Sequence, residues 1–293
     1  MRCRPQATAL VWIALRLLIS QVTPVRAADP EINQLLQTPV ARDWVTNGGN
    51  LTNQRYSMLT QIDTTNVKQL KGVWMTRLKR SGFGTKYSAE ASPLVKDGVM
   101  YMVTGNDDVF ALNAKTGEIL WQRWSWIDQK ISVVCCGWLS RGLAMGEGML
   151  FVGQLDANVV ALDIKTGREV WKTPIEDWHN GYSITSAPLY YDGIVYSGIS
   201  GGELGIRGRL TALDAKTGKI LWRAYTVPGP GEFGSDTWPV PARQRSLAGP
   251  RFGIRRRSIR NWGSSTSRPA IADPIMTGRC AKATICSAPR SSR

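Results

Sequence analysis

The chain has 293 residues, of which 43% are hydrophobic, enough for one large domain or two small ones. Its 29 glycines, 15 prolines and 12 tryptophans argue against a helical bundle and against a disordered chain. The net charge of +15 would favour nucleic acid or an acidic membrane as a partner if it lay on a folded surface. Residues 28–238 carry 21 basic and 21 acidic side chains, however, so the excess charge lies at the two ends of the chain.

The first 27 residues have the composition of a secretory leader. Arg2 and Arg4 form a positive start, residues 7–20 are mostly apolar although Arg16 interrupts them, and Ala27 ends a small-residue cleavage pattern. The apolar run is shorter than the roughly 20 residues of a membrane span, and no later segment is long and apolar enough to be one. We therefore predict a signal peptide over residues 1–27, with an uncleaved anchor as the alternative.

Three segments further along the chain repeat one another. They read ALNAKTGEILW at residues 111–121, ALDIKTGREVW at 161–171 and ALDAKTGKILW at 212–222, and Trp74 stands where an earlier, diverged copy would end. A period near 50 residues built from short strands is typical of a β-propeller with one blade per repeat. The sequence predicts an all-β, partial propeller of about four blades within residues 28–238.

The local pattern supports this interpretation. Strands are expected over residues 99–103, 109–112, 149–152 and 159–162, and each Lys-Thr-Gly is expected to close a tight hairpin, because Gly accepts a positive φ. A Trp at one fixed place in each repeat can pack between neighbouring blades. Trp74, Trp121, Trp171 and Trp222 are therefore expected to be structural and not a ligand cage.

Several common kinds of site can be set aside. His179 is the only histidine, which argues against a His-rich metal site and weakens any Ser-His-Asp triad. Residues 229–234, GPGEFG, match a dinucleotide-binding pattern, but no strand and helix surround them, so a turn-rich connector is favoured.

Two motifs leave a functional and a structural interpretation open. Cys135 and Cys136 are adjacent, and in an exported protein they could form a strained ring at a functional site or remain two small buried thiols. Glu203 follows a glycine pair in a segment that the other repeats lack. Its carboxylate suits a hard cation such as Ca²⁺, and a solvated loop glutamate is the alternative.

Motifs spread over about residues 40–238 resemble the pyrroloquinoline quinone (PQQ)-dependent alcohol dehydrogenases, the methanol/ethanol dehydrogenase family. They are DWVTNGGNLTNQRYSMLTQID at residues 43–63, EASPLV at 90–95, CCGWLSRGLA at 135–144, ITSAP at 184–188 and SGGELGIRG at 200–208. The resemblance implies an eight-bladed propeller with the cofactor on its axis. It also implies a periplasmic enzyme that passes electrons from a small alcohol to a cytochrome c or a quinone.

The resemblance also implies roles for individual residues. Cys135 and Cys136 match the disulfide ring that lies against the quinone, Arg141 matches the arginine at the quinone oxygens, and Glu203 matches a Ca²⁺ ligand. The remaining cofactor-binding residues implied by the matching motifs are Glu90, Thr185, Ser200, Gly201 and Gly202.

Residues 239–293 depart from the family. The family's stacking Trp, its Asn metal ligand and its catalytic Asp come later than Trp238, and residues 239–293 contain no counterpart of them. Reading the underlying DNA one nucleotide earlier from about Ala248 can encode a family-like continuation with GG-x-T-x-W and TGN motifs. We therefore expect an aberrant, frameshifted and disordered Arg-rich tail on the N-terminal half of such an enzyme, and no catalytic activity from the chain as written.

Two other functions are weaker alternatives. A non-catalytic propeller of the outer-membrane assembly type shares the Trp repeat, but it has no need of Cys135-Cys136 or SGGELG and should carry a Cys just after its leader, where Ala27 and Ala28 stand. A nucleic-acid binder that used the basic tail should interleave aromatic and basic residues there, and the tail does not. No nucleic-acid partner is expected.

Overall fold

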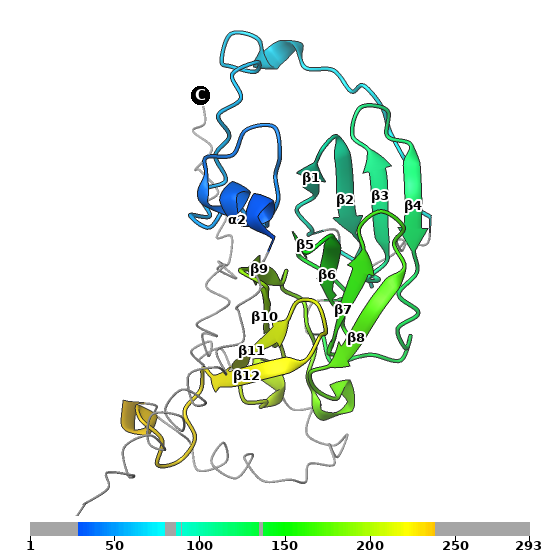
Figure 1. Ribbon diagram of the computed structural model, residues 1–293. Helices are drawn as coiled ribbons and strands as arrows, with labels where there is room; N and C mark the ends of the chain where they lie inside the picture. Colours follow the sequence, from blue (N-terminus) through cyan, green and yellow to red (C-terminus); the bar gives the residue numbers. More distant parts are fainter. Residues whose placement is uncertain (1–28, 80–85, 89, 135–136, 238–293) are drawn as a thin grey trace, which may run out of the picture.

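The computed structural model describes residues 29–79, 86–88, 90–134 and 137–237 (Figure 1). These residues form three four-stranded sheets in which each strand pairs antiparallel with the next along the chain. The first sheet comprises β1 (Leu94–Lys96), β2 (Val99–Val103), β3 (Val109–Asn113) and β4 (Ile119–Arg123). The second comprises β5 (Ala144–Gly146), β6 (Met149–Gly153), β7 (Asn158–Asp163) and β8 (Glu169–Pro174), and the third β9 (Leu189–Tyr191), β10 (Ile194–Gly198), β11 (Arg209–Asp214) and β12 (Ile220–Tyr225).

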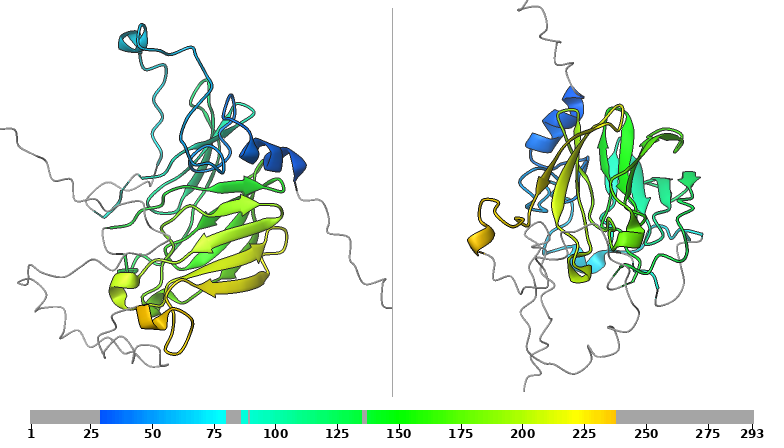
Figure 2. Two further views of the ribbon diagram at one scale, coloured as in Figure 1. Left: turned by 90° about the vertical axis from the view of Figure 1, so that its left-hand side faces the viewer. Right: turned by 90° about the horizontal axis from the view of Figure 1, so that it is seen from below.

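The sheets are stacked face to face in chain order, as the blades of a propeller are (Figures 1 and 2). The predicted all-β, partial-propeller fold is confirmed, and the four expected strands lie in β2, β3, β6 and β7. The described residues form three blades and not four, because the segment around Trp74 contains no assigned strand.

Two kinds of hairpin build each blade. Two-residue turns join the first strand to the second, and their first residues, Asp97, Glu147 and Asp192, all have positive φ, as do the glycines that follow them. This backbone is the type I′ turn that matches the twist of antiparallel strands. At the turn between the third and fourth strands, Gly117, Gly167 and Gly218 have φ of 75, 68 and 70°, which confirms the predicted role of Lys-Thr-Gly.

A side-chain cap precedes each Lys-Thr-Gly glycine. Asp163 Oδ1 accepts bonds from the amides of Lys165 and Thr166 at 3.1 and 2.8 Å, and Asp214 accepts the equivalent pair from Lys216 and Thr217. The pKa of Asp163 is lowered, first by its bond from the Thr166 hydroxyl and then by these amides. The turn is thus stabilised by a short side chain bonded to its own backbone.

Tryptophan seals each interface between blades. The indole Nε1 of Trp121 donates to Ile164 O at 3.1 Å, and that of Trp171 donates to Ala215 O at 2.9 Å, in each case in the next blade. Trp74 makes the same bond to Ala114 O at 3.1 Å, so this residue seals the first blade although no strand carries it. The prediction that these tryptophans are structural holds for these three side chains.

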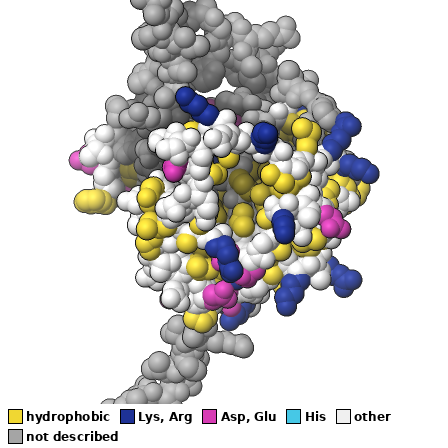
Figure 3. Space-filling view, turned by 90° about the horizontal axis from the view of Figure 1, so that it is seen from above, with side chains coloured by type: hydrophobic (Ala, Val, Ile, Leu, Met, Phe, Trp, Pro, Cys, Tyr) yellow, Lys and Arg dark blue, Asp and Glu magenta, His cyan; other side chains and the backbone are white. Residues whose placement is uncertain are grey.

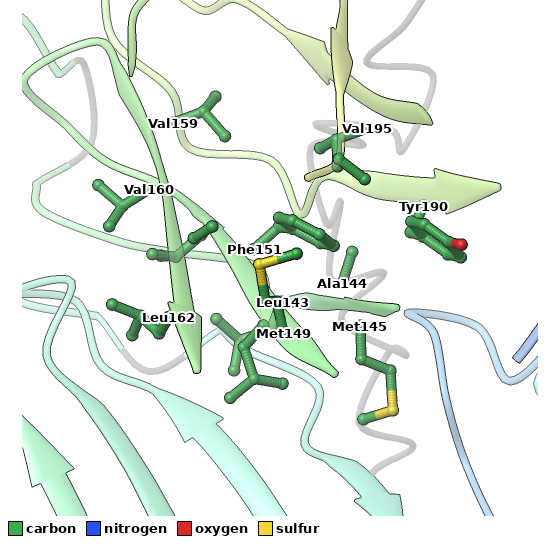
Figure 4. Packing of buried hydrophobic residues seen from close by; sticks show 14 of the residues in the cluster. Leu143, Ala144, Met145, Met149, Phe151, Val159, Val160, Leu162, Tyr190 and Val195 are labelled. Carbon is green, nitrogen blue, oxygen red and sulfur yellow. The ribbon is translucent and has the colours of Figure 1, made fainter. Parts of the chain in front are cut away.

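The core lies between the blades and is centred on the second one (Figure 4). Leu143, Leu150, Phe151 and Leu162 are completely or almost completely buried, and the Phe151 ring stacks on Tyr190 of β9 with centroids 6.0 Å apart. Since all five residues of β6 are buried, neighbouring blades cover both faces of the second sheet.

The N-terminal part of the described chain covers the blades and adds no strand to their sheets, although Trp44 forms an isolated antiparallel bridge with Val95 of β1. Helix α2 (Pro30–Gln37) buries Ile32 and Leu36 in the core, whereas the stretch from residue 51 to 75, which includes the short helix η1 (Val67–Gln69), is mostly exposed. In this stretch Met75 is 97% exposed. Apolar side chains also reach the surface on the face of the molecule seen from above (Figure 3). Within the ranges that the structure describes, none of the helices has the length and apolar character needed to cross a bilayer.

Candidate functional site

Three segments that lead into the first strands of the blades meet at one place. Ser92 and Gly142 form a parallel bridge between the first two segments, and the Arg141 amide donates to Thr185 O of the third at 3.0 Å. Strands β5 and β9 are also in contact. The three inner strands, β1, β5 and β9, therefore place Glu90, Arg141 and Thr185 near one another.

Their side chains form a continuous polar chain. Arg141 Nη2 lies 3.3 Å from Glu90 Oε2, and Arg141 Nη1 donates to Thr185 Oγ1 at 3.0 Å. The Thr185 hydroxyl in turn lies 2.8 Å from Ser200 Oγ, which comes just after β10. Four residues that sequence motifs singled out are thus brought together, although 110 positions separate the first from the last.

This polar chain is open to solvent at Glu90 and Arg141, buried at Thr185 and half-buried at Ser200. The side chains of Arg141 and Glu90 are 35% and 39% exposed, whereas Thr185 is buried. Ser140, which precedes Arg141 in the chain, is also buried, and its Oγ has no hydrogen-bond partner among the described residues. A guanidinium and several hydroxyls at a half-exposed position can bind carboxylate or carbonyl oxygens.

The glycine pair has a specific backbone. Gly201 has a φ of 127°, and a Cβ there would lie 2.0 Å from Gly181 O, so only glycine fits. A Cβ on Gly202 would meet nothing within 4 Å. Gly202 and Glu203 belong to the short helix η3 (Gly202–Leu204), where both are exposed.

Comparison with known proteins identifies the family. Residues 44–250 match the family described as PQQ, glucose/ethanol/alcohol dehydrogenase, β-propeller domain. The chain belongs to this family. It is 37% identical over 219 residues to the quinoprotein alcohol dehydrogenase PedH of Pseudomonas putida, and 38% identical over 219 residues to a lanthanide-dependent methanol dehydrogenase of Methylacidiphilum fumariolicum. These matches cover 74% and 73% of this chain.

Solved structures of the family agree with the fold. The quinohemoprotein alcohol dehydrogenase of Comamonas testosteroni superposes with a TM-score of 0.62 at 36% identity over 67% of this chain. A europium-containing methanol dehydrogenase superposes with a TM-score of 0.61 at 37% identity over 69% of this chain. The chain spans about a third of the length of these relatives, since it covers 36% of PedH and 34% of the lanthanide-dependent enzyme.

The hydrogen-bond donors of this chain fit part of a PQQ site. PQQ carries three carboxylates and two quinone carbonyls, which need cationic and hydroxyl donors. Arg141, Thr185 and Ser200 supply such donors in one connected group. This donor set is compatible with one side of an anionic, oxygen-rich ligand.

The described residues do not supply the ligands of a calcium site. Ca²⁺ takes about 6–8 oxygen ligands, several of them carboxylates. Among the described residues, no three His, Cys, Asp or Glu side chains lie close enough to hold a metal ion. Exposed Glu203 therefore provides one candidate ligand and not a site.

The predicted disulfide between Cys135 and Cys136 lies outside the described residues. The next part of the chain is firmly packed: Trp138 is buried, its Nε1 donates to Ile131 O at 3.1 Å, and Lys86 Nζ lies 3.5 Å from the centroid of its ring. A charged amine over an indole face is a stabilising cation–π contact.

Two residues near the site were not among the predicted ones. Asn47 Nδ2 donates to Arg141 O at 3.1 Å, and Ser88 Oγ donates to Glu90 Oε1 at 3.2 Å. Asn47 lies within the family-like segment of residues 43–63, so the resemblance carried a signal for it. Its bond spans 94 positions, however, and no local pattern shows such a contact.

Proposed function

We propose that this chain is the N-terminal part of an exported, PQQ-dependent alcohol dehydrogenase. The observation that carries the proposal is the connected group of Glu90, Arg141, Thr185 and Ser200, which three neighbouring blades supply. Membership of the PQQ family and the names of the relatives give the reaction class. The substrate would be a small alcohol, oxidised to the carbonyl compound.

The residues of this chain would bind and orient the cofactor. Arg141 would hold an oxygen of PQQ by charge-assisted bonds, with Glu90 fixing its guanidinium from the other side. The Thr185 and Ser200 hydroxyls and the backbone of Gly201 and Gly202 would bind carboxylate oxygens. When bound, PQQ supplies the electron-accepting quinone that the protein itself lacks. A Cys135–Cys136 disulfide would lie against one face of the cofactor.

The metal and the electron acceptor are part of the same proposal. Calcium would be held by Glu203 together with ligands that the described residues do not supply, and it would then act as a Lewis acid near the quinone. The names of two relatives, one lanthanide-dependent and one europium-containing, make a lanthanide an equal candidate. The acceptor would be a cytochrome c or a membrane quinone, and the enzyme would work in the periplasm after removal of residues 1–27.

PQQ binding to the purified chain tests the proposal. We expect PQQ to quench tryptophan fluorescence saturably, and Arg141→Ala to weaken binding at least about tenfold, because a hydrogen bond to a charged group contributes about 1.5–3 kcal/mol. Arg168→Ala is the matched control, since Arg168 is an exposed arginine on the β7–β8 turn. If the wild-type chain failed to bind PQQ, or if Arg141→Ala and Arg168→Ala bound it equally well, the proposal would be wrong.

We also propose that residues 239–293 are read out of frame. The family match ends at residue 250, close to the point where a shift of one nucleotide restores family-like motifs. Resequencing the gene from codon 238 is the test. An open frame that continues into further Trp repeats supports the proposal, and an unchanged reading through residue 293 contradicts it.

A further inference from the structure

Helix α2 contacts all three blades at equivalent places. Its capping residue Asp29 exchanges two bonds with Glu147 of the second blade: the Asp29 amide donates to Glu147 Oε1, and the Glu147 amide donates to Asp29 Oδ2, both at 3.0 Å. Asn33, one helical turn later, exchanges a similar pair with Asp192 of the third blade, at 3.3 and 3.1 Å. Glu31 pairs with Lys96 of the first blade at 2.7 Å.

The three contact points match one another in the repeat. Glu147 and Asp192 are the first residues of the type I′ turns that end β5 and β9, and Lys96 directly precedes the corresponding turn residue Asp97, where β1 ends. The helix and its capping residue therefore contact the turns that follow β5 and β9 and the last residue of β1, at the same end of three successive blades. Figures 1 and 2 show α2 against this end of the sheets.

Glu147 is the centre of this contact. Its side chain is 7% exposed and, besides the Asp29 amide, it accepts the Tyr190 hydroxyl at 3.0 Å and pairs with Lys216 Nζ at 2.8 Å. Tyr190 and Lys216 both belong to the third blade, so one carboxylate joins α2, the second blade and the third. Burial raises the pKa of Glu147, but Lys216, the Asp29 amide and Tyr190 outweigh it, and the net pKa is lowered. The Glu147 carboxylate is thus ionised, and both of its oxygens have partners.

The inner strands connect this contact to the candidate site. β1, β5 and β9 have three residues each, and the segments before them carry Glu90, Arg141 and Thr185. Six positions separate Arg141 from Glu147, or about 20 Å of extended chain. Since α2 fixes the separation of the three strands at one end, it constrains the separation of the three polar side chains at the other.

We propose that α2 is a positioning clasp for the cofactor site, with Asp29, Asn33 and Glu147 as its positioning residues. The clasp sets the spacing of the inner strands and so the geometry of Glu90, Arg141 and Thr185. Its effect on PQQ rests on the proposed function, whereas its effect on strand spacing does not.

Hydrogen exchange on the full chain tests the clasp directly. The amides of Arg141 and Ser92 bond across the inner strands at the site end, to Thr185 O and Arg141 O. We expect Asn33→Ala and Glu147→Gln to speed exchange of these two amides about tenfold at a temperature where amides of β3, β7 and β11 keep wild-type rates. Gln34→Ala, on the exposed side of the same helix, should leave them unchanged. The double variant Asn33→Asp with Asp192→Asn exchanges the two partners and should restore slow exchange.

PQQ affinity is the second measurement. We expect Asn33→Ala and Glu147→Gln to raise the dissociation constant three- to tenfold, with the swapped double variant close to wild type. If exchange changes only at the turns near Asp29 and Asp192, or if PQQ affinity stays unchanged in a chain that binds PQQ, the clasp does not position the site. If the wild-type chain binds no PQQ, the proposed function fails, and the exchange rates of Arg141 and Ser92 still decide whether α2 sets the strand spacing.

Discussion

Trp171 and Trp222 hold the same position in two nearly identical repeats, yet their surroundings differ. The Trp171 ring is largely covered, and its indole donates to Ala215 O of the third blade. Trp222 is 43% exposed and touches Tyr196 of its own sheet, with ring centroids 6.0 Å apart. Among the described residues, the same sequence motif seals one interface, whereas no blade follows Trp222 and part of its ring is exposed.

The difference shows that the seal needs two parts. A Cβ on Gly218 would lie 2.6 Å from the Trp171 ring, and a Cβ on Gly167 would lie 2.5 Å from the Trp121 ring. The glycine of one Lys-Thr-Gly turn therefore leaves room for the tryptophan of the preceding blade. Each repeat therefore supplies a tryptophan ring that packs on the next blade, and a glycine that makes room for the tryptophan of the blade before.

Replacing each of the two tryptophans separately should give the largest difference in stability between variants. We expect Trp171→Ala to lower the free energy of unfolding by about 2–3 kcal/mol, because it removes a packed ring and a hydrogen bond. Trp222→Ala should cost less than about 1 kcal/mol, since much of that ring already meets water. Urea unfolding followed by circular dichroism measures both. Equal losses would mean that Trp222 is packed in solution as Trp171 is.

The glycines should give the next largest contrast. Gly167 and Gly148 have nearly the same φ, 68 and 70°, but a Cβ on Gly148 would meet nothing within 4 Å. Gly148→Ala should cost about 1 kcal/mol for the left-handed backbone alone. Gly167→Ala should cost about 1–2 kcal/mol more, because the new methyl displaces the Trp121 indole. Thermal unfolding gives the two losses, and a shift in Trp fluorescence for Gly167→Ala alone would identify the cause.

The repeats explain why so much of the fold could be predicted. Trp121, Trp171 and Trp222 recur with Lys-Thr-Gly at fixed offsets, and local turn chemistry then places the strands. Trp74 was misleading only in part: it makes the expected contact with the first blade, but the described chain pairs no strand with its segment. A strand is defined by its pairing with a neighbouring strand. A single well-packed residue such as Trp74 can therefore make its contact without belonging to a strand.

The site was less accessible to prediction than the fold. The candidates Glu90, Arg141, Thr185 and Ser200 were singled out through family motifs, since a lone Arg or Thr in a loop carries no signal of its own. Their mutual contacts, and those of Asn47 and α2, join residues far apart in the chain. Such contacts depend on how the blades stack. The periodicity of the sequence predicts that neighbouring blades pack together, but it does not predict which side chains meet.

A buried carboxyl distinguishes the first interface from the second. Asp107 of the first blade accepts the Leu155 amide of the second at 2.7 Å, and the equivalent turn residue in the second blade is Ala157. Burial raises the pKa of Asp107 well above 3.8, although the Leu155 amide lowers it. The folded protein therefore keeps this proton to a higher pH than the unfolded chain, so that stability falls as pH rises above about 4.

Asp107→Asn should remove that pH dependence, because an amide oxygen can still accept the Leu155 bond and does not ionise. We expect the melting temperature of the variant to exceed that of wild type by a few degrees at pH 8, and the gap to close towards pH 4. Asp128→Asn, at an exposed position that does not act on Asp107, is the control. A gap that does not change with pH would show that Asp107 is not the group that titrates.

The smallest expected contrast concerns the residue two places after each tryptophan. At the interface sealed by Trp171, Thr173 Oγ1 donates to Gly218 O at 2.8 Å, whereas at the preceding interface Arg123 pairs with Glu169 at 2.8 Å. Thr173→Val keeps the shape and should cost about 1 kcal/mol, because it leaves a carbonyl without its donor. Arg123→Ala should cost less, about 0.5 kcal/mol, since exposed ion pairs are weak. Only the stability loss in Arg123→Ala should shrink between about 0.05 and 1 M salt, because salt screens the charges and leaves the hydroxyl bond intact. A salt-dependent loss in Thr173→Val would show that the interface sealed by Trp171 also depends on charge.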